Sequence, residues 1–82
     1  LAIFKALANG NRLKMLKLMQ AASGGAISVN ALAQKMEIGQ PTISDHLKLL
    51  RTNKIVKAKQ DGSNMYYSIN DPFVEKVISS LD

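Results

Sequence analysis

Residues Gly39–Leu50 read GQPTISDHLKLL and directly follow the stretch ALAQKMEI at residues 31–38. The earlier stretch has the period of a short helix that ends in a tight turn. A second helix is predicted to begin with Gly39 as its cap and Pro41 in its first turn, where a missing N–H removes no intrahelical hydrogen bond. Two helices joined by so short a turn indicate a helix-turn-helix over about residues 30–52.

The second of these helices has two different faces. Ile43, Leu47 and Leu50 recur at helical spacing and form its predicted buried stripe. The opposite face is short, polar and basic toward its C-terminal end. A helix that enters a DNA major groove needs such a face, because its first residues must reach base edges while Lys and Arg meet phosphates. An ordinary solvated surface helix is the alternative.

Charge adds to this interpretation. The chain has 11 Lys and Arg against 6 Asp and Glu, a net charge of +5, and a pI near 9.8. Between residues 48 and 59 every charged residue is basic: Lys48, Arg51, Lys54, Lys57 and Lys59. A cluster of this kind is suited to a phosphate backbone, although a charge run by itself is more often a solvated face.

Length and composition predict one small domain. A chain of 82 residues with 46% hydrophobic content supports a single core of modest stability, which dimerisation would increase. The absence of Cys excludes disulfides and thiolate metal sites. No stretch resembles a membrane span or a signal peptide, so we expect a cytoplasmic protein without membrane contact. Because the chain begins at Leu1 rather than Met, we expect residues to be missing at one or both ends.

The remaining segments alternate between helical and extended patterns. Residues 1–8 and 12–22 have helical periods, and Asn9 lies in a break with capping character between them. Residues 27–29 are predicted to form a short strand, followed by Asn30 as the cap of the first helix of the helix-turn-helix.

The C-terminal third changes period twice. Over about residues 55–69 apolar and polar residues alternate around an Asp-Gly-Ser turn, which predicts a β-hairpin whose inward residues are Val56, Ala58, Met65, Tyr67 and Ile69. Asp71 then caps a helix over residues 71–82, with Pro72 at its first position. The order of elements predicts a winged helix-turn-helix over residues 1–82: mainly α with a small β-hairpin, or α+β.

In this order and spacing the chain resembles the ArsR/SmtB family of bacterial and archaeal repressors over nearly its whole length. The matching stretches are LANGNRLKMLKLM, ALAQKMEIGQPTISDHLKLLRTNKIVKAK and DGSNMYYSI. The resemblance implies a homodimer whose first and last helices pack together. It also implies that each subunit places its reading helix in one of two successive major grooves of a near-palindromic operator, and that repression is relieved by an effector, often a metal ion.

The terminal helices, at about residues 1–8 and 71–82, carry apolar stripes wider than one small core requires. An exposed stripe of that size normally marks an interface. The predicted dimer interface therefore comprises Leu1, Phe4, Phe73, Val74, Val77, Ile78 and Leu81.

The sensor sites of the family are not matched. Where thiol-dependent members have Cys-Val-Cys, this chain has Ser-Val-Asn at residues 28–30, which offers no soft ligand. Of the zinc ligands on the last helix of other members only Asp71 matches, since Phe73 occupies a His position. The single His, His46, lies on the reading helix, where a structural or phosphate-contact role is favoured over metal binding. We therefore expect no metal site and no cofactor.

For DNA contacts, the resemblance matches Gln40 and Ser44 to family positions that meet DNA. Gln can pair bidentately with adenine, and Ser can reach several bases. Asp45 either accepts from cytosine N4 or pairs on the helix surface with Lys48. The predicted DNA-binding residues are Gln40, Pro41, Thr42, Ser44, Asp45, His46, Lys48, Arg51, Lys57, Lys59 and Ser63.

In the wing, Ser63 stands where many relatives have Arg, so Lys57 and Lys59 are expected to supply the backbone contacts there. Tyr66 and Tyr67 are predicted to pack within the wing rather than to stack on bases.

Three function classes follow. The favoured one is a sequence-specific, double-stranded-DNA-binding transcriptional regulator acting as a homodimeric repressor. The alternative is a winged-helix protein–protein interaction module of a larger assembly. An enzyme is disfavoured, because the chain has no Cys, one His and no glycine-rich phosphate loop.

Overall fold

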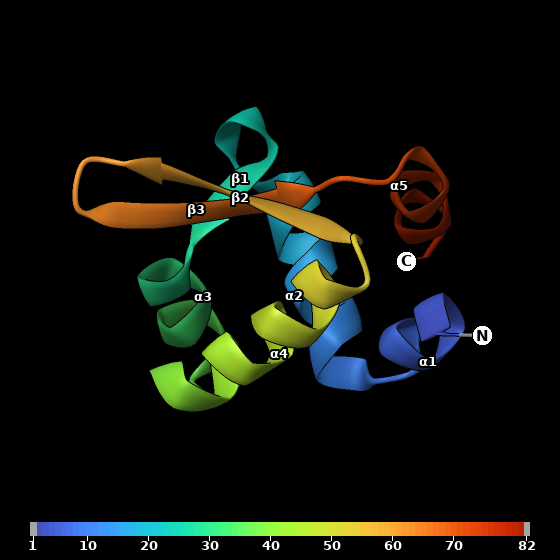
Figure 1. Cartoon of the computed structure of the whole chain (residues 1–82), viewed down its shortest axis with the longest axis horizontal. Coiled ribbons are helices and arrows are strands. Elements are labelled where there is room, and N and C mark those ends of the chain that lie inside the picture. Colours follow the sequence, from blue (N-terminus) through green and yellow to red (C-terminus); the bar gives the residue numbers. More distant parts are fainter. Residues whose placement is uncertain (1, 82) are drawn as a thin grey trace.

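A computed structural model describes residues 2–81 and shows helices packed against a small antiparallel sheet (Figure 1). The sheet hairpin extends to one side, and the two terminal helices lie together at the other. The elements in chain order are α1 (Ala2–Leu7), α2 (Gly10–Ala21), a 3₁₀ turn (Ser23–Gly25), β1 (Ala26–Ser28), α3 (Val29–Met36), α4 (Gln40–Thr52), β2 (Val56–Asp61), β3 (Asn64–Ile69) and α5 (Pro72–Ser79). The predicted winged helix-turn-helix is confirmed.

Three of the four predicted helix caps are confirmed: Asn9, Gly39 and Asp71. The side chain of Asn9 accepts a hydrogen bond from the backbone N–H of Arg12 at 3.1 Å, at the start of α2. Asp71 Oδ1 accepts from the N–H groups of Phe73 and Val74 at 2.8 and 3.1 Å, at the start of α5. Such caps satisfy backbone donors that have no partner within the helix.

The cap predicted at Asn30 is wrong. Ser28, not Asn30, caps α3: its Oγ accepts from the N–H of Ala31 at 3.1 Å, and the helix already begins at Val29. The last residue of β1 thus also starts the helix. Asn30 lies within the first turn, with its side chain free for another partner.

The turn between α3 and α4 is short, as predicted: α3 ends at Met36 and α4 begins at Gln40. Glu37 adopts the left-handed conformation (φ 57°), which reverses the chain after Met36. Gly39 is the N-cap of α4, and its carbonyl accepts from the N–H groups of Thr42 and Ile43 at 3.1 and 3.2 Å. Pro41 in the first turn matches the prediction.

The sheet contains the predicted hairpin and one edge strand. Its order is β1-β3-β2, with both pairs antiparallel. Ile27 lies opposite Tyr67, and Val56 opposite Ile69, so these four side chains face the helices. Met65 was predicted to point inward as well, but it is exposed, because the tip of the hairpin extends beyond the core. The edge pairing of β1 holds the hairpin to the start of α3.

One core unites all these elements. The buried residues come from every helix and strand: Ala6, Leu7, Met15, Leu16, Met19, Ile27, Leu32, Met36, Ile43, Leu47, Leu50, Ile55, Val56, Ile69, Val74 and Ile78. Val74 and Ile78 are 0% and 1% exposed within the single subunit. The prediction that these two residues form a dimer interface is therefore wrong, since α5 uses them to pack onto its own domain.

Replacing Leu47 by Ala tests the importance of the α4 stripe. Leu47 is 1% exposed, so we expect the free energy of unfolding to fall by about 2–5 kcal/mol. Leu49→Ala, on the same helix but with a side chain that is 38% exposed, should change it by about 1 kcal/mol or less. Denaturant unfolding at one fixed protein concentration measures both, and equal losses would show that α4 is not anchored through this stripe.

Candidate nucleic-acid interface

Helix α4 presents the polar face that its sequence predicted. Its apolar stripe is fully buried, and the residues on the other side are exposed: Gln40, Pro41, Thr42, Ser44, Asp45, Lys48, Leu49 and Arg51. His46 is half-buried at the border of the two faces. Packing against α3 and β2 fixes the rotation of α4, so this face points outward as one surface.

The start of α4, the start of α3 and the tip of the wing surround one shallow hollow of about 280 Å³. The hollow brings the predicted contacts Gln40, Ser44 and Ser63 together. Its full lining is Ser28, Val29, Asn30, Gln40, Ser44, Ser63, Asn64 and Met65. Three segments that are far apart in the sequence thus form one polar surface at the N-terminal end of α4.

Asn30 is a site residue that the sequence reasoning missed. Its Oδ1 accepts a hydrogen bond from Nε2 of Gln40, ten residues later. The pattern Ser-Val-Asn contained the signal, since either Ser28 or Asn30 was able to cap α3 and the other side chain would then be free.

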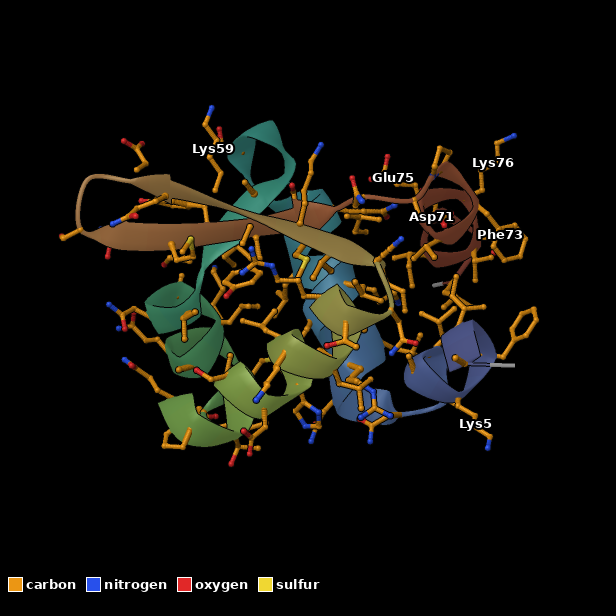
Figure 2. All side chains as sticks on the ribbon, viewed as in Figure 1. Lys5, Lys59, Asp71, Phe73, Glu75 and Lys76 are labelled. Carbon is orange, nitrogen blue, oxygen red and sulfur yellow. The ribbon has the colours of Figure 1, made fainter. Side chains whose placement is uncertain are left out.

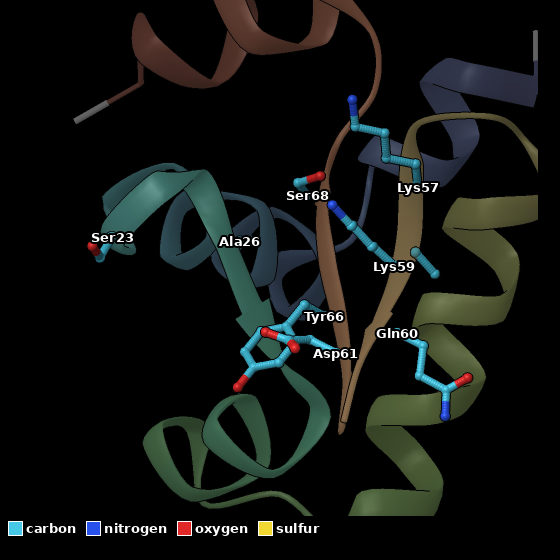
Figure 3. A pocket seen from close by; sticks show the side chains of 9 residues that line it. Ser23, Ala26, Lys57, Lys59, Gln60, Asp61, Tyr66 and Ser68 are labelled. Atoms are coloured by element: carbon cyan, nitrogen blue, oxygen red, sulfur yellow. The ribbon is translucent and has the colours of Figure 1, made fainter. Parts of the chain in front are cut away.

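Lys57 and Lys59 lie on a different surface. They occur in β2 opposite Ser68 and Tyr66, on the face of the sheet that turns away from the helices. There they line an open groove of about 720 Å³ together with Ser23, Ala26, Ala58, Gln60, Asp61, Tyr66 and Ser68 (Figure 3). Figure 2 shows Lys59 on the side of the sheet opposite to α4. This placement does not support the phosphate contacts predicted for the two lysines.

The two tyrosines of β3 also point in opposite directions. Tyr67 is half-buried and packs against the core, as predicted for a wing residue. Tyr66 is half-buried on the outer face and lines the groove with Lys59. Neither borders the hollow at the start of α4.

The terminal helices leave an aromatic pair at the surface. The rings of Phe4 and Phe73 meet edge to face, with centroids 6.4 Å apart and planes at 86°, although each residue is 52% exposed. Leu81 is 40% exposed, and Val77, four residues after Phe73 in α5, is half-buried. Leu1, which was also predicted for the dimer interface, lies outside the described residues.

Residues 2–81 also bear on whether the chain has a metal site or a membrane-spanning helix. Within that range no three His, Asp or Glu side chains gather in a way that could hold a metal ion. The carboxylate of Asp71 is engaged as the cap of α5. None of the described helices has the length and apolar run that a bilayer crossing requires.

Comparisons with known proteins agree with this geometry. The Helix-turn-helix domain family matches residues 7–57. An uncharacterised HTH-type transcriptional regulator of Methanocaldococcus jannaschii is 39% identical over 98% of this chain and 88% of its own length. The arsenical resistance operon repressor of Staphylococcus aureus is 31% identical, over 98% of this chain and 74% of its own length.

A solved structure supports the same assignment. It is the homodimeric winged helix-turn-helix DNA-binding domain of a possible ArsR-family regulator from Mycobacterium bovis. That domain superposes with a TM-score of 0.84 at 31% identity and covers 95% of this chain and 69% of its own. Sequence, fold and the exposed face of α4 thus agree, and the chain belongs to the ArsR/SmtB family of winged helix-turn-helix, DNA-binding transcriptional regulators.

Proposed function

We propose that this chain acts as a homodimeric repressor that places α4 of each subunit in successive major grooves of a near-palindromic operator. The observation that carries the proposal is the exposed polar face of α4, which begins beside the wing tip and ends in basic residues. Two relatives are named as repressors, which supports repression rather than activation of transcription. Residues 1–82 then act as one DNA-binding domain.

The residues of this face divide into two roles. Gln40, Ser44 and Asp45 lie within the first two turns of α4, where a reading helix approaches base edges. Pro41, Thr42 and His46 flank them. Lys48 and Arg51 are exposed toward the C-terminal end, where cations meet phosphates and hold the helix in register. Ser63 at the wing tip is proposed to contact the neighbouring DNA backbone because it borders the same hollow as Gln40 and Ser44, whereas Lys57 and Lys59 are left out of the proposed interface.

Binding to duplex DNA should weaken steeply as salt rises. Each neutralised phosphate contributes about 0.9 to the slope of log K against log salt, so roughly four contacts, from Lys48 and Arg51 of two subunits, give a slope of about −3.6. Fluorescence anisotropy on a labelled duplex measures this slope. A flat response would favour the alternative function, a protein–protein interaction module.

Matched lysine variants in the same titration locate the phosphate contacts. Lys48→Ala should reduce the slope by about 2, one contact in each subunit. Lys59→Ala removes the same charge from the outer face of the sheet and should leave the slope unchanged. If the two variants behave alike, the duplex also contacts the outer face.

Base selection should depend on the first turns of α4. Replacing Gln40, Ser44 or Asp45 by Ala should change the preferred operator sequence, by roughly 1–3 kcal/mol for each good base contact. Lys48→Ala should instead weaken all sequences alike. Selection from a randomised duplex pool tests this, and identical profiles for the three helix variants would place another face of the protein in the groove.

The homodimer is proposed to form through exposed apolar residues of α1, of α5 and of the segment that follows α5. Phe4, Phe73, Val77 and Leu81 remain accessible in the single subunit, unlike Val74 and Ile78. Aromatic side chains are enriched among interface residues, and a contiguous exposed apolar patch marks an interaction site.

A charge placed on this surface should separate the subunits. Phe73→Glu is expected to yield monomers and to weaken operator binding at least tenfold, because both half-sites must then be bound independently. Lys76→Glu reverses a charge on the same helix as the matched control. Sedimentation at micromolar concentration measures the state, and a Phe73→Glu protein that remains dimeric would place the interface elsewhere.

A further inference from the structure

The hydrogen bond between Asn30 and Gln40 joins two side chains at the entrance of the proposed reading surface. Both residues are exposed, and both line the hollow that also contains Ser44 and the wing tip. Gln40 Nε2 donates and Asn30 Oδ1 accepts. Because Ser28 is the N-cap of α3, the side chain of Asn30 is not needed to cap that helix.

This bond changes what Gln40 can offer to a base. A primary amide has two N–H donors and one carbonyl acceptor. With one N–H directed at Asn30, the other N–H and Oε1 remain available. One donor beside one acceptor matches adenine, whose N7 accepts and whose N6 amino group donates, whereas guanine presents two acceptors, N7 and O6. A held amide therefore fits adenine and cannot donate twice to guanine.

We propose that Asn30 is a positioning residue that fixes the amide of Gln40 for reading adenine in the operator. The inference rests on the proposed function, because it assumes that α4 lies in the major groove. Asn30 acts through Gln40. It restricts the rotamers of a flexible side chain before DNA binds and sets which amide atom points outward.

The surroundings favour such a pairing. The first turns of α3 and α4 are held together by packing: Leu32 and Ile43 are both fully buried in the same core. Ser63, Asn64 and Met65 of the wing border the same hollow, so a duplex seated there would exclude water from the amide pair. A hydrogen bond that is weak in water contributes more once its solvent competitors are removed.

Two substitutions at residue 30 separate positioning from other roles. Asn30→Ala removes the acceptor and lets the Gln40 amide rotate, so the preference for adenine over guanine at the base read by Gln40 should fall by about tenfold. Asn30→Asp keeps an acceptor for Nε2 and should retain that preference. Its added negative charge should lower affinity for all sequences alike. Selection from a randomised duplex pool measures the preference, and circular dichroism checks that α3 is intact.

The double variant supplies the decisive comparison. If Asn30 acts through Gln40, then Asn30→Ala combined with Gln40→Ala should have the base profile of Gln40→Ala alone. An unchanged adenine preference in Asn30→Ala, with Gln40→Ala altering it, would overturn the positioning role and leave the proposed function standing. A uniform loss of affinity in Asn30→Ala would assign Asn30 to a phosphate instead. If Gln40→Ala itself changes nothing, the proposed reading face fails, and the inference fails with it.

Discussion

The burial of one stripe of α4 is the constraint on which the rest of this structure depends. Ile43, Leu47 and Leu50 are essentially inaccessible to solvent, and they fix both the position of the helix and its rotation. The buried residues within residues 2–81 form one cluster, so this part of the chain offers no second core to hold α4 if this contact is lost. The same packing that stabilises the domain therefore decides which side chains reach outward. In the proposed function, stability and DNA recognition therefore depend on opposite faces of the same helix.

The small sheet organises the remainder of the reading surface. Because β1 pairs with the central strand β3 and runs straight into α3, the wing and the first helix of the helix-turn-helix are joined through Ser28. The wing tip consequently lies beside the first turns of α3 and α4. Alternation along β2 sends Val56 into the core and Lys57 and Lys59 to the outer face. The basic run 48–59 is thus continuous in sequence but divided between two surfaces in space.

The proposed function draws on this arrangement in three ways. Exposed α4 residues supply base and phosphate contacts, the aromatic pair of Phe4 and Phe73 supplies a surface for a second copy, and the bond from Gln40 to Asn30 orders a reading side chain. Family membership makes DNA the partner, but the family's name says nothing of which base is read. Hydrogen-bond chemistry at residues 30 and 40 is what connects the fold to a particular base.

The sequence by itself determined the class of fold and the face of α4, because helical period, strand alternation and caps such as Asn9 and Asp71 are local properties. Only the tertiary structure decided the features that depend on contacts between segments distant in the sequence. It showed that Val74 and Ile78 belong to the subunit's own core, that Ser28 caps α3, and that Lys57 and Lys59 leave the face of α4. It also paired Asn30 with Gln40. Helical periodicity shows that one face of a helix is apolar. It does not show whether that face packs against its own domain or against a second copy of the chain. That choice is made by packing between residues distant in sequence.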